Sequence, residues 1–376
     1  LDIDLQRRIE QRITDPQLNP EYCRAGTAAV VLDVRSGEIL ALVSLPDYDL
    51  NLARDRYGRL LADPNRPTIN RALHQIYPPG SVAKPIILIA GLESGVITAE
   101  EPISCPAAEP PAGWPRCLIY RLSHTGHDNL WTNNARNAIK GSCNIYFSRL
   151  ADMLDPPVLQ QWLLHFGYGR EIPLDCPAPP PAGTVPRRLR QWSGEIGSTM
   201  AAAHPEGEVP PLRGRDRKMF GIGQGNFRVT PLQVANAFAT LARGGRSLPP
   251  RLFLSPAPAA PAEPVDLPIA PATLDVVRDG MSAVVNEHGG TAQRVFAGND
   301  LGRHGVKVYG KTGSTERPDH AWFAGFAEDR DGAKIALAVV VEGGQHGGSD
   351  AGTIARAIFE FCVDAGYVGS APPASR

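Results

Sequence analysis

Apolar and polar positions divide the chain into a strand-rich beginning, a helical middle and a strand-rich end. Two apolar runs at 27–33 and 38–44 flank a turn at Gly37 and predict a β-hairpin. Three further runs of strand length return late in the chain, at 305–310, 321–327 and 334–342. Short turns between these three favour antiparallel pairing, so one sheet can join both ends of the chain.

Helical spacing of apolar residues predicts several helices between and after these strands. They cover 81–95, 136–154, 157–167, 230–243, 273–288 and 351–367. The clearest boundaries belong to 230–243, where Thr230 can cap the start, Pro231 takes the first position and Gly244 follows the end. Irregular or proline-rich stretches separate the helices, at 98–135, 176–186, 204–211 and 249–272.

These elements predict an α/β fold, with a mostly antiparallel five-stranded sheet flanked by helices and a helical subdomain. The whole chain, 1–376, is then one domain. Its sheet subdomain combines 1–95 with 290–376, and its mainly helical subdomain covers 96–289. A cleft between the two is the natural place for a ligand.

Charge and hydropathy give no sign of general nucleic-acid binding or of a membrane-spanning helix, although local charged patches remain possible. Lys plus Arg number 38 and Asp plus Glu 39, so the net charge of -1 gives no general attraction to nucleic acid. No apolar run reaches the roughly 18 residues that a membrane-spanning helix needs. The chain opens directly on a helical pattern without a signal peptide, which predicts further sequence upstream in the full protein.

Ser81 and Lys84 place a hydroxyl and an amine one helical turn apart. A serine is a weak nucleophile until a neighbouring base takes its proton. A lysine can do so only where burial or nearby positive charge lowers its pKa from about 10.4 towards neutrality. Alone the pattern is very short, and most such pairs are accidental surface neighbours.

Two further motifs offer the groups that such a nucleophile needs. Ser142 carries a hydroxyl that can relay a proton, and Asn144 an amide that can bind a substrate carbonyl. Lysine, threonine, glycine and serine follow one another at 311–314, behind a strand-like segment. There Lys311 can hold a carboxylate, and Gly313 lets a substrate backbone approach closely. Taken singly, the two motifs are also typical of a helix cap and a polar strand end.

The three motifs in this order are typical of penicillin-binding proteins and class A β-lactamases. Longer strings are more specific: YPPGSVAKP at 77–85, AIKGSCNIYF at 138–147, GIGQG at 221–225, TPLQVANAFATLARGG at 230–245, GGTAQRV at 289–295 and DHAWFAGFA at 319–327. In these segments the chain resembles the transpeptidase domain of class B penicillin-binding proteins, of the PBP2 (elongation, MrdA-like) type. The resemblance covers nearly the whole chain. One departure is Ser314, where threonine is commoner in the family.

The resemblance implies the penicillin-binding protein/β-lactamase-like transpeptidase fold and a serine D,D-transpeptidase that needs no catalytic cofactor. It would cross-link peptidoglycan stem peptides and be blocked by β-lactams. Ser81 would attack the bond between two terminal D-alanines, and Lys84 would accept its proton. Ser142 would pass that proton to the leaving amine, and Asn144 would bind the substrate amide. The terminal carboxylate would lie against Lys311, Thr312, Gly313 and Ser314.

The resemblance also implies a cellular setting and leaves alternative functions open. The chain would be the periplasmic domain of an inner-membrane-anchored protein, with pedestal and anchor outside this chain and a membrane glycan polymerase as partner through those regions. A D,D-carboxypeptidase or β-lactamase would form the same acyl-enzyme and use water as acceptor. A non-catalytic β-lactam-binding sensor would keep the fold without turnover. The intact motifs and the longer strings favour the transpeptidase.

Cysteine and histidine residues around the second motif suggest a structural metal. Cys105, Cys117, His127 and Cys143 form a candidate Cys₃His zinc set, with His124 as the alternative to His127. Cys143 lies inside the second motif, so a zinc ion there would brace it. The family resemblance adds support, since some members carry a metal beside this motif. A Cys105–Cys117 disulfide and unpaired thiols are the other interpretations.

Overall fold

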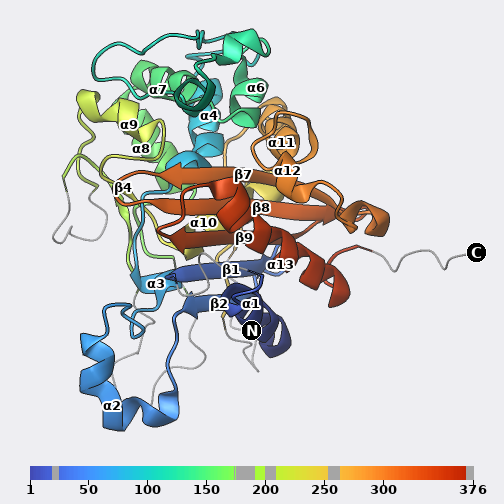
Figure 1. The fold of residues 1–376 in the computed structure, drawn as a ribbon. Coiled ribbons are helices and arrows are strands. Elements are labelled where there is room, and N and C mark those ends of the chain that lie inside the picture. The colour runs from blue at the N-terminus through green and yellow to red at the C-terminus, as the bar shows by residue number, and fades with distance from the viewer. Residues whose placement is uncertain (19–24, 173, 175–190, 200–208, 253–262, 370–376) are drawn as a thin grey trace, which may run out of the picture.

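The computed structural model describes residues 1–18, 25–172, 174, 191–199, 209–252 and 263–369 (Figure 1). Its centre is a five-stranded sheet in the order β2-β1-β9-β8-β7, with every neighbouring pair antiparallel. The strands are β1 Thr27–Asp33, β2 Ile39–Leu45, β7 Lys307–Thr315, β8 His320–Asp329 and β9 Gly332–Glu342. Two small ribbons pair β3 Glu195–Ile196 with β4 Phe227–Arg228 and β5 Arg246–Ser247 with β6 Val265–Asp266. The predicted sheet joining both ends of the chain is confirmed.

Helices surround this sheet and build the part of the molecule above β7 in Figure 1. The α-helices are α1 Ile3–Thr14, α2 Leu50–Ala62, α3 Arg71–His74, α4 Lys84–Glu93, α5 Leu118–Ser123, α6 Ala135–Lys140, α7 Asn144–Met153, α8 Pro156–His165, α9 Arg217–Phe220, α10 Pro231–Ala242, α11 Pro271–Asn286, α12 Gln293–Phe296 and α13 Gly352–Asp364. Short 3-10 turns are η1 Gly80–Ala83, η2 His127–Asn129, η3 Gly214–Asp216 and η4 Leu301–His304, and η5 Gly347–Ala351 is a π-turn.

The sheet is covered on both faces, with α13 in front of it and α10 behind it in Figure 1. Helix α10 is buried along its whole length and contacts β1, β8 and β9, while α13 contacts β8, β9 and α1. Both faces of the central strands are therefore apolar, which explains the continuous apolar runs of β1 and β9. Although α10 lies within 96–289, it packs on the sheet, and the division into two subdomains stays a prediction.

The predicted caps of α10 are confirmed. Thr230 accepts a hydrogen bond from the Gln233 N–H, the Gln233 side chain accepts one from the Thr230 N–H, and Pro231 occupies the first helical position. This reciprocal arrangement satisfies two N–H groups that a helix start otherwise leaves unpaired. The helix ends at Ala242, and Gly244 follows with a φ of 69°.

Two predicted helices are wrong in their boundaries around the first two motifs. The helix predicted at 81–95 begins as the 3-10 turn η1 and becomes α-helical only at Lys84. The helix predicted at 136–154 is two helices, α6 and α7, separated by a turn that contains Ser142. Ser142 has a φ of 54°, a left-handed conformation that interrupts a right-handed helix and that non-glycine residues seldom adopt.

The strand predicted at 305–310 is too short, because β7 runs to Thr315 and contains the whole third motif. Lys311 and Thr312 are buried there, so their polar side chains hid the continuation of the strand from the hydropathy pattern. Helices α2 and α5 were not predicted, and α5 interrupts the stretch 98–135. Two predicted loops lie wholly or mostly outside the described residues, at 176–186 and at 204–211. Two of the six cysteines are outside them as well, Cys23 and Cys176. Among the described residues, no helix has the length and apolar character to cross a bilayer.

Candidate active site

Ser81 lies in η1 at the entrance to α4, next to the edge strand β7. Gly80 before it has a φ of 55°, and a side chain at that position would lie 3.1 Å from the Ser314 carbonyl oxygen. The N–H of Lys84 donates to the Ser81 carbonyl, so both residues share one turn as predicted. The Ser81 side chain is partly exposed, whereas Lys84 is completely buried. The hydroxyl is thus reachable by a ligand while the amine is held inside.

The Lys84 amine joins the first motif to the second. Its Nζ donates to the Ser142 carbonyl oxygen at 2.7 Å, to the Ser142 Oγ at 3.2 Å and to the Asn144 Oδ1 at 2.7 Å. Burial lowers the pKa of Lys84 to about 8, against the opposing effect of the sulfurs of Cys117, Cys143 and Cys105. About a tenth of the amine is therefore neutral at pH 7, far more than for a lysine with its ordinary pKa, and a neutral amine can accept a proton from a hydroxyl.

The turn that carries Ser142 is bonded back onto α6. The N–H of Ser142 donates to Ile139 at 3.1 Å, and that of Cys143 donates to Ala138 at 2.9 Å. These bonds hold Ser142 in its left-handed conformation. Asn144 begins α7, and its Nδ2 donates to the Arg116 carbonyl oxygen at 2.9 Å. Both polar atoms of the Asn144 amide are therefore already oriented by the protein.

The third motif runs along β7, opposite this turn. Lys311 is completely buried, and its Nζ donates to the Thr312 carbonyl oxygen at 3.0 Å. Burial, together with the positive charge of Lys84, lowers the pKa of Lys311 well below its ordinary value. Because the Lys84 charge lowers the pKa of Lys311, each amine affects the protonation of the other. The Ser314 hydroxyl accepts a hydrogen bond from the Gly347 N–H at 3.1 Å.

Gly313 has a packing role in addition to the one predicted from sequence. A side chain there would lie 3.1 Å from the Pro79 carbonyl oxygen and 3.2 Å from the Val82 Cγ1. The missing side chain thus lets the nucleophile turn lie directly against β7. This contact brings Ser81 beside the strand that carries Lys311.

Several residues that support the motifs were not assigned roles from sequence. Gly223, in the GIGQG string, has a φ of 68° and accepts a hydrogen bond from the Gly80 N–H at 2.9 Å. The Trp322 indole donates to the Pro78 carbonyl oxygen at 3.0 Å, and the Thr291 and Thr312 hydroxyls are 2.6 Å apart. The only sequence signal was that these residues lie in longer family-like strings, because their contacts join segments far apart in the chain.

The predicted metal ligands come together beside the second motif. Cys105, Cys117, His127 and Cys143 are all buried, and their ligand atoms lie within 4.8 Å of one another. The His127 Nδ1 is 3.4 Å from each of the Cys105 and Cys117 sulfurs, and the Cys117 and Cys143 sulfurs are 4.0 Å apart. Two sulfurs on a tetrahedral zinc ion with Zn–S bonds of about 2.3 Å lie roughly 3.8 Å apart. The four side chains fit that geometry, and His124 is exposed and outside the cluster.

Neighbouring groups also suit a metal centre. The His127 Nε2 is 3.1 Å from the Gly141 carbonyl oxygen, which favours a proton on Nε2 and leaves Nδ1 free to bind a metal. The Cys143 sulfur accepts hydrogen bonds from the Asn133 Nδ2 at 3.3 Å and from the Tyr146 N–H at 3.4 Å, as a thiolate would. Cys105 and Cys117 are free thiols here, so the alternative disulfide is not formed in this structure.

Comparison with known proteins decides the family. A family model described as the penicillin binding protein transpeptidase domain matches residues 27–360. The chain belongs to the penicillin-binding protein transpeptidase family. The matched region contains all three motifs and the whole sheet of this transpeptidase domain.

Individual relatives refine this assignment. The peptidoglycan D,D-transpeptidase MrdA of Escherichia coli strain K12 is 30% identical over 393 residues, which cover 96% of this chain and 57% of that protein. The chain therefore spans little more than half the length of this relative. A structure of Pseudomonas aeruginosa PBP2 in complex with WCK 5153 is 27% identical with a TM-score of 0.77, covering 100% of this chain and 80% of its own.

A structure of penicillin-binding protein A from Mycobacterium tuberculosis, an imipenem acyl-enzyme complex, is 27% identical with a TM-score of 0.70. It covers 96% of this chain and 77% of its own. Both structures share the fold predicted from the sequence. The predicted resemblance to PBP2-type class B penicillin-binding proteins is confirmed.

Proposed function

We propose that this transpeptidase domain cross-links peptidoglycan stem peptides through a Ser81 acyl-enzyme and is inhibited by β-lactams. The observation that carries the proposal is the buried Lys84 amine, which contacts Ser142 and Asn144. The backbone N–H of Lys84 donates a hydrogen bond to the Ser81 carbonyl oxygen, so the amine and the nucleophile belong to one turn. The name of the E. coli relative supports the reaction, and the acyl-enzyme of the M. tuberculosis relative supports the reactivity towards β-lactams.

Acylation begins with the neutral Lys84 amine. The Ser81 Oγ attacks the carbonyl carbon between two terminal D-alanines, and its proton moves to Lys84 as the new C–O bond forms. The C–N bond then breaks, and the Ser142 hydroxyl passes the proton from Lys84 to the leaving D-alanine amine. An amine of a second stem peptide attacks the resulting ester, which restores the Ser81 hydroxyl and completes the cross-link. No cofactor enters either half-reaction.

Strand β7 provides the surface on which the donor peptide binds. It is an edge strand, so every second backbone N–H faces away from β8. The N–H groups of Ser81 and Ser314 would bind the oxyanion, and each such donor contributes roughly 3 kcal/mol to the transition state. Lys311 is buried without a described carboxylate partner, which suits it to hold the terminal carboxylate of the donor. Thr312 and Ser314 add hydroxyls beside it, and the Asn144 amide binds the donor backbone.

Labelling with a fluorescent penicillin tests the nucleophile. The wild-type protein should become covalently labelled, Ser81→Ala should not, and Ser94→Ala at the end of α4 should label normally. Labelling that survives Ser81→Ala would overturn the assignment. Rapid turnover of nitrocefin would instead indicate a β-lactamase. Release of D-alanine from a stem peptide without transfer to an added amine would indicate a carboxypeptidase.

We also propose that Cys105, Cys117, His127 and Cys143 hold a structural zinc ion. Such an ion would brace the loop and turn that carry the second motif, and it has no part in the proton transfers. Mass spectrometry of protein prepared without EDTA should find about one equivalent of zinc, and less than roughly a tenth would contradict the proposal. His124→Ala should keep the metal, whereas His127→Ala should lose it.

The setting of the reaction follows from its substrate. We propose that this domain works in the periplasm as part of an inner-membrane-anchored protein and acts beside a membrane glycan polymerase. The peptidoglycan named for the E. coli relative supports this setting. Affinity purification of the full-length protein from cross-linked membranes should recover a glycan polymerase, and its absence would contradict the partnership.

A further inference from the structure

The position of the second motif depends on helix α6. Residues 141–143 contain no α-helical turn of their own, and their N–H groups donate back to carbonyls of α6. Any tilt or shift of α6 is therefore transmitted to Ser142, and through Ser142 and Asn144 to the Lys84 amine. What holds α6 in place consequently affects the catalytic geometry.

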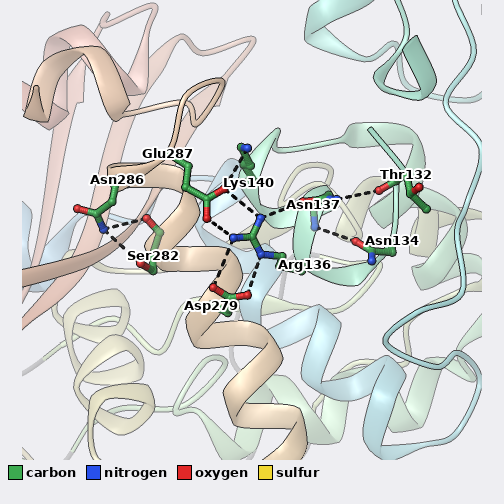
Figure 2. Close-up of polar contacts among 9 residues, drawn as sticks. All are labelled: Thr132, Asn134, Arg136, Asn137, Lys140, Asp279, Ser282, Asn286 and Glu287. Carbon is green, nitrogen blue, oxygen red and sulfur yellow. Dashed lines mark hydrogen bonds and ion pairs between the residues drawn. The ribbon is translucent and has the colours of Figure 1, made fainter. Parts of the chain in front are cut away.

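A charged cluster joins α6 to α11, and Figure 2 shows Arg136 at its centre. The Arg136 Nε donates to Asp279 at 2.7 Å, and its two terminal nitrogens contact Glu287, one of them at 3.1 Å. Lys140, one turn further along α6, also donates to Glu287 at 3.1 Å. Hydrogen bonds to Glu287 and Asp279 raise the pKa of Arg136, and the bond from Arg136 lowers the pKa of Glu287.

Helix α11 in turn is joined to the strand that carries the third motif. The Asn286 Nδ2 donates to the Val308 carbonyl oxygen of β7 at 2.9 Å, and α11 packs along β7. The two helices are also very close, since a side chain at Gly280 would lie 3.0 Å from the Arg136 carbonyl oxygen. The contacts thus run from the turn of Ser142 through α6 and α11 to β7.

We propose that Arg136 is a positioning residue, which holds the turn of Ser142 and Asn144 in register with the Lys311 strand through Asp279 and Glu287. The proposal rests on the acyl-transfer function above. Arg136 is suited to the task because its planar guanidinium binds two carboxylates at once, which a lysine amine cannot reproduce with the same directionality. Both carboxylates lie on or directly after α11, so the cluster fixes the orientation of one helix against the other.

Loss of the cluster should affect the chemical step more than ligand binding. A misplacement of about 1 Å lowers the rate of a positioned reaction by up to roughly a hundredfold. Part of the contact between α6 and α11 remains at Gly280, so we expect a loss of about tenfold for Arg136→Gln. β-Lactam binding before acylation involves the backbone edge of β7, which these substitutions leave in place, and should stay within about twofold.

Stopped-flow acylation with a chromogenic cephalosporin separates these two quantities. Arg136→Gln should lower the acylation rate constant at saturation and leave the half-saturating concentration unchanged. Arg136→Lys, which keeps the positive charge but loses the planar guanidinium that binds two carboxylates, should recover part of the rate. In the Asp279→Asn/Glu287→Gln background, removing Arg136 should cause no further loss, because its partners are already gone.

Controls distinguish positioning from general destabilisation. Arg8→Gln removes another surface ion pair, Arg8–Asp364 at 2.7 Å, and should acylate at the wild-type rate. If Arg136→Gln does not fold, Glu287→Gln tests the same link while leaving the Arg136–Asp279 pair. A wild-type rate in the folded Arg136 variants, or a rate loss that is additive with loss of both carboxylates, would overturn the inference. A wild-type protein that is not acylated at all would refute the proposed function instead.

Discussion

At the scale of single residues, Lys84 links burial to reactivity. Because burial lowers the pKa of Lys84 to about 8, its neutral form is about a tenth of the total at pH 7 and becomes dominant above pH 8. The charged and sulfur groups around it are Lys311 on β7 and Cys117, Cys143 and Cys105. Since only the neutral amine accepts the Ser81 proton, the acylation rate should rise with pH and level off above about 8.

The rate of penicillin acylation, measured between about pH 6 and pH 10, checks this expectation. A lysine with its ordinary pKa would give a rate still rising near pH 10. Lys84→Arg serves as the matched variant, because arginine stays charged throughout; its rate should not change with pH and should lie roughly a thousandfold below the wild-type plateau. A wild-type profile that is flat across pH 8 would contradict the role of Lys84 as base.

Ser142 allows its conformation and its chemistry to be separated. Its φ of 54° strains any residue with a side chain, whereas glycine adopts this conformation freely. Ser142→Gly and Ser142→Ala both remove the hydroxyl, so both should lose acyl transfer. Ser142→Gly should nevertheless be more stable than Ser142→Ala, by about 1 kcal/mol. Urea unfolding of both variants measures the difference, and equal stabilities would mean that the turn is not strained.

At the scale of elements, the close contact between the GIGQG segment and the nucleophile turn is open to a sharp test. A side chain at Gly223 would lie 2.0 Å from the Gly80 carbonyl oxygen, so Gly223→Ala must move the turn that carries Ser81. We expect at least a roughly hundredfold loss of acylation, measured with fluorescent penicillin.

Gly244→Ala is the matched control for Gly223→Ala. Gly244 has a φ of 69°, almost the same as the 68° of Gly223, but no atom lies within 4 Å of a side chain there. The control should therefore lose about 1 kcal/mol of stability from backbone strain alone and acylate normally. A similar loss of acylation in both variants would show that strain, rather than the contact with Gly80, is responsible.

The elements also show what could be predicted from sequence. The strand pairing and the caps of α10 followed from local patterns, because apolar runs and capping residues act over a few positions. The break between α6 and α7 at Ser142 could not be predicted in this way, since the left-handed conformation of this non-glycine residue depends on hydrogen bonds to α6. The candidate ligands were recognisable by their chemistry, but choosing His127 over His124 required the fold. Gly223 and Thr291 act through contacts with distant segments, which periodicity does not reveal.

At the scale of the whole molecule, one buried ion pair joins the beginning and the end of the domain. Glu342 ends β9, and its carboxylate accepts hydrogen bonds from the Arg71 guanidinium at 3.1 Å and from the Tyr77 hydroxyl at 2.8 Å. Arg71 is only 2% exposed. Tyr77 lies just before the nucleophile turn, and its ring packs edge-on against Trp322 of β8. The network therefore holds the entry to the active site against the sheet.

Glu342→Ala should consequently destabilise the domain as a whole. Removing the carboxylate leaves the Arg71 guanidinium buried without its counter-charge, which typically lowers the free energy of unfolding by about 3–5 kcal/mol. Asp364→Asn breaks the exposed Arg8–Asp364 pair, whose side chains are 41% and 60% exposed, and should cost no more than about 1 kcal/mol. Urea unfolding of the two variants compares them directly. A larger loss for Glu342→Ala would support the role of this carboxylate in holding the Arg71 and Tyr77 segment against the sheet, whereas equal losses would contradict that role.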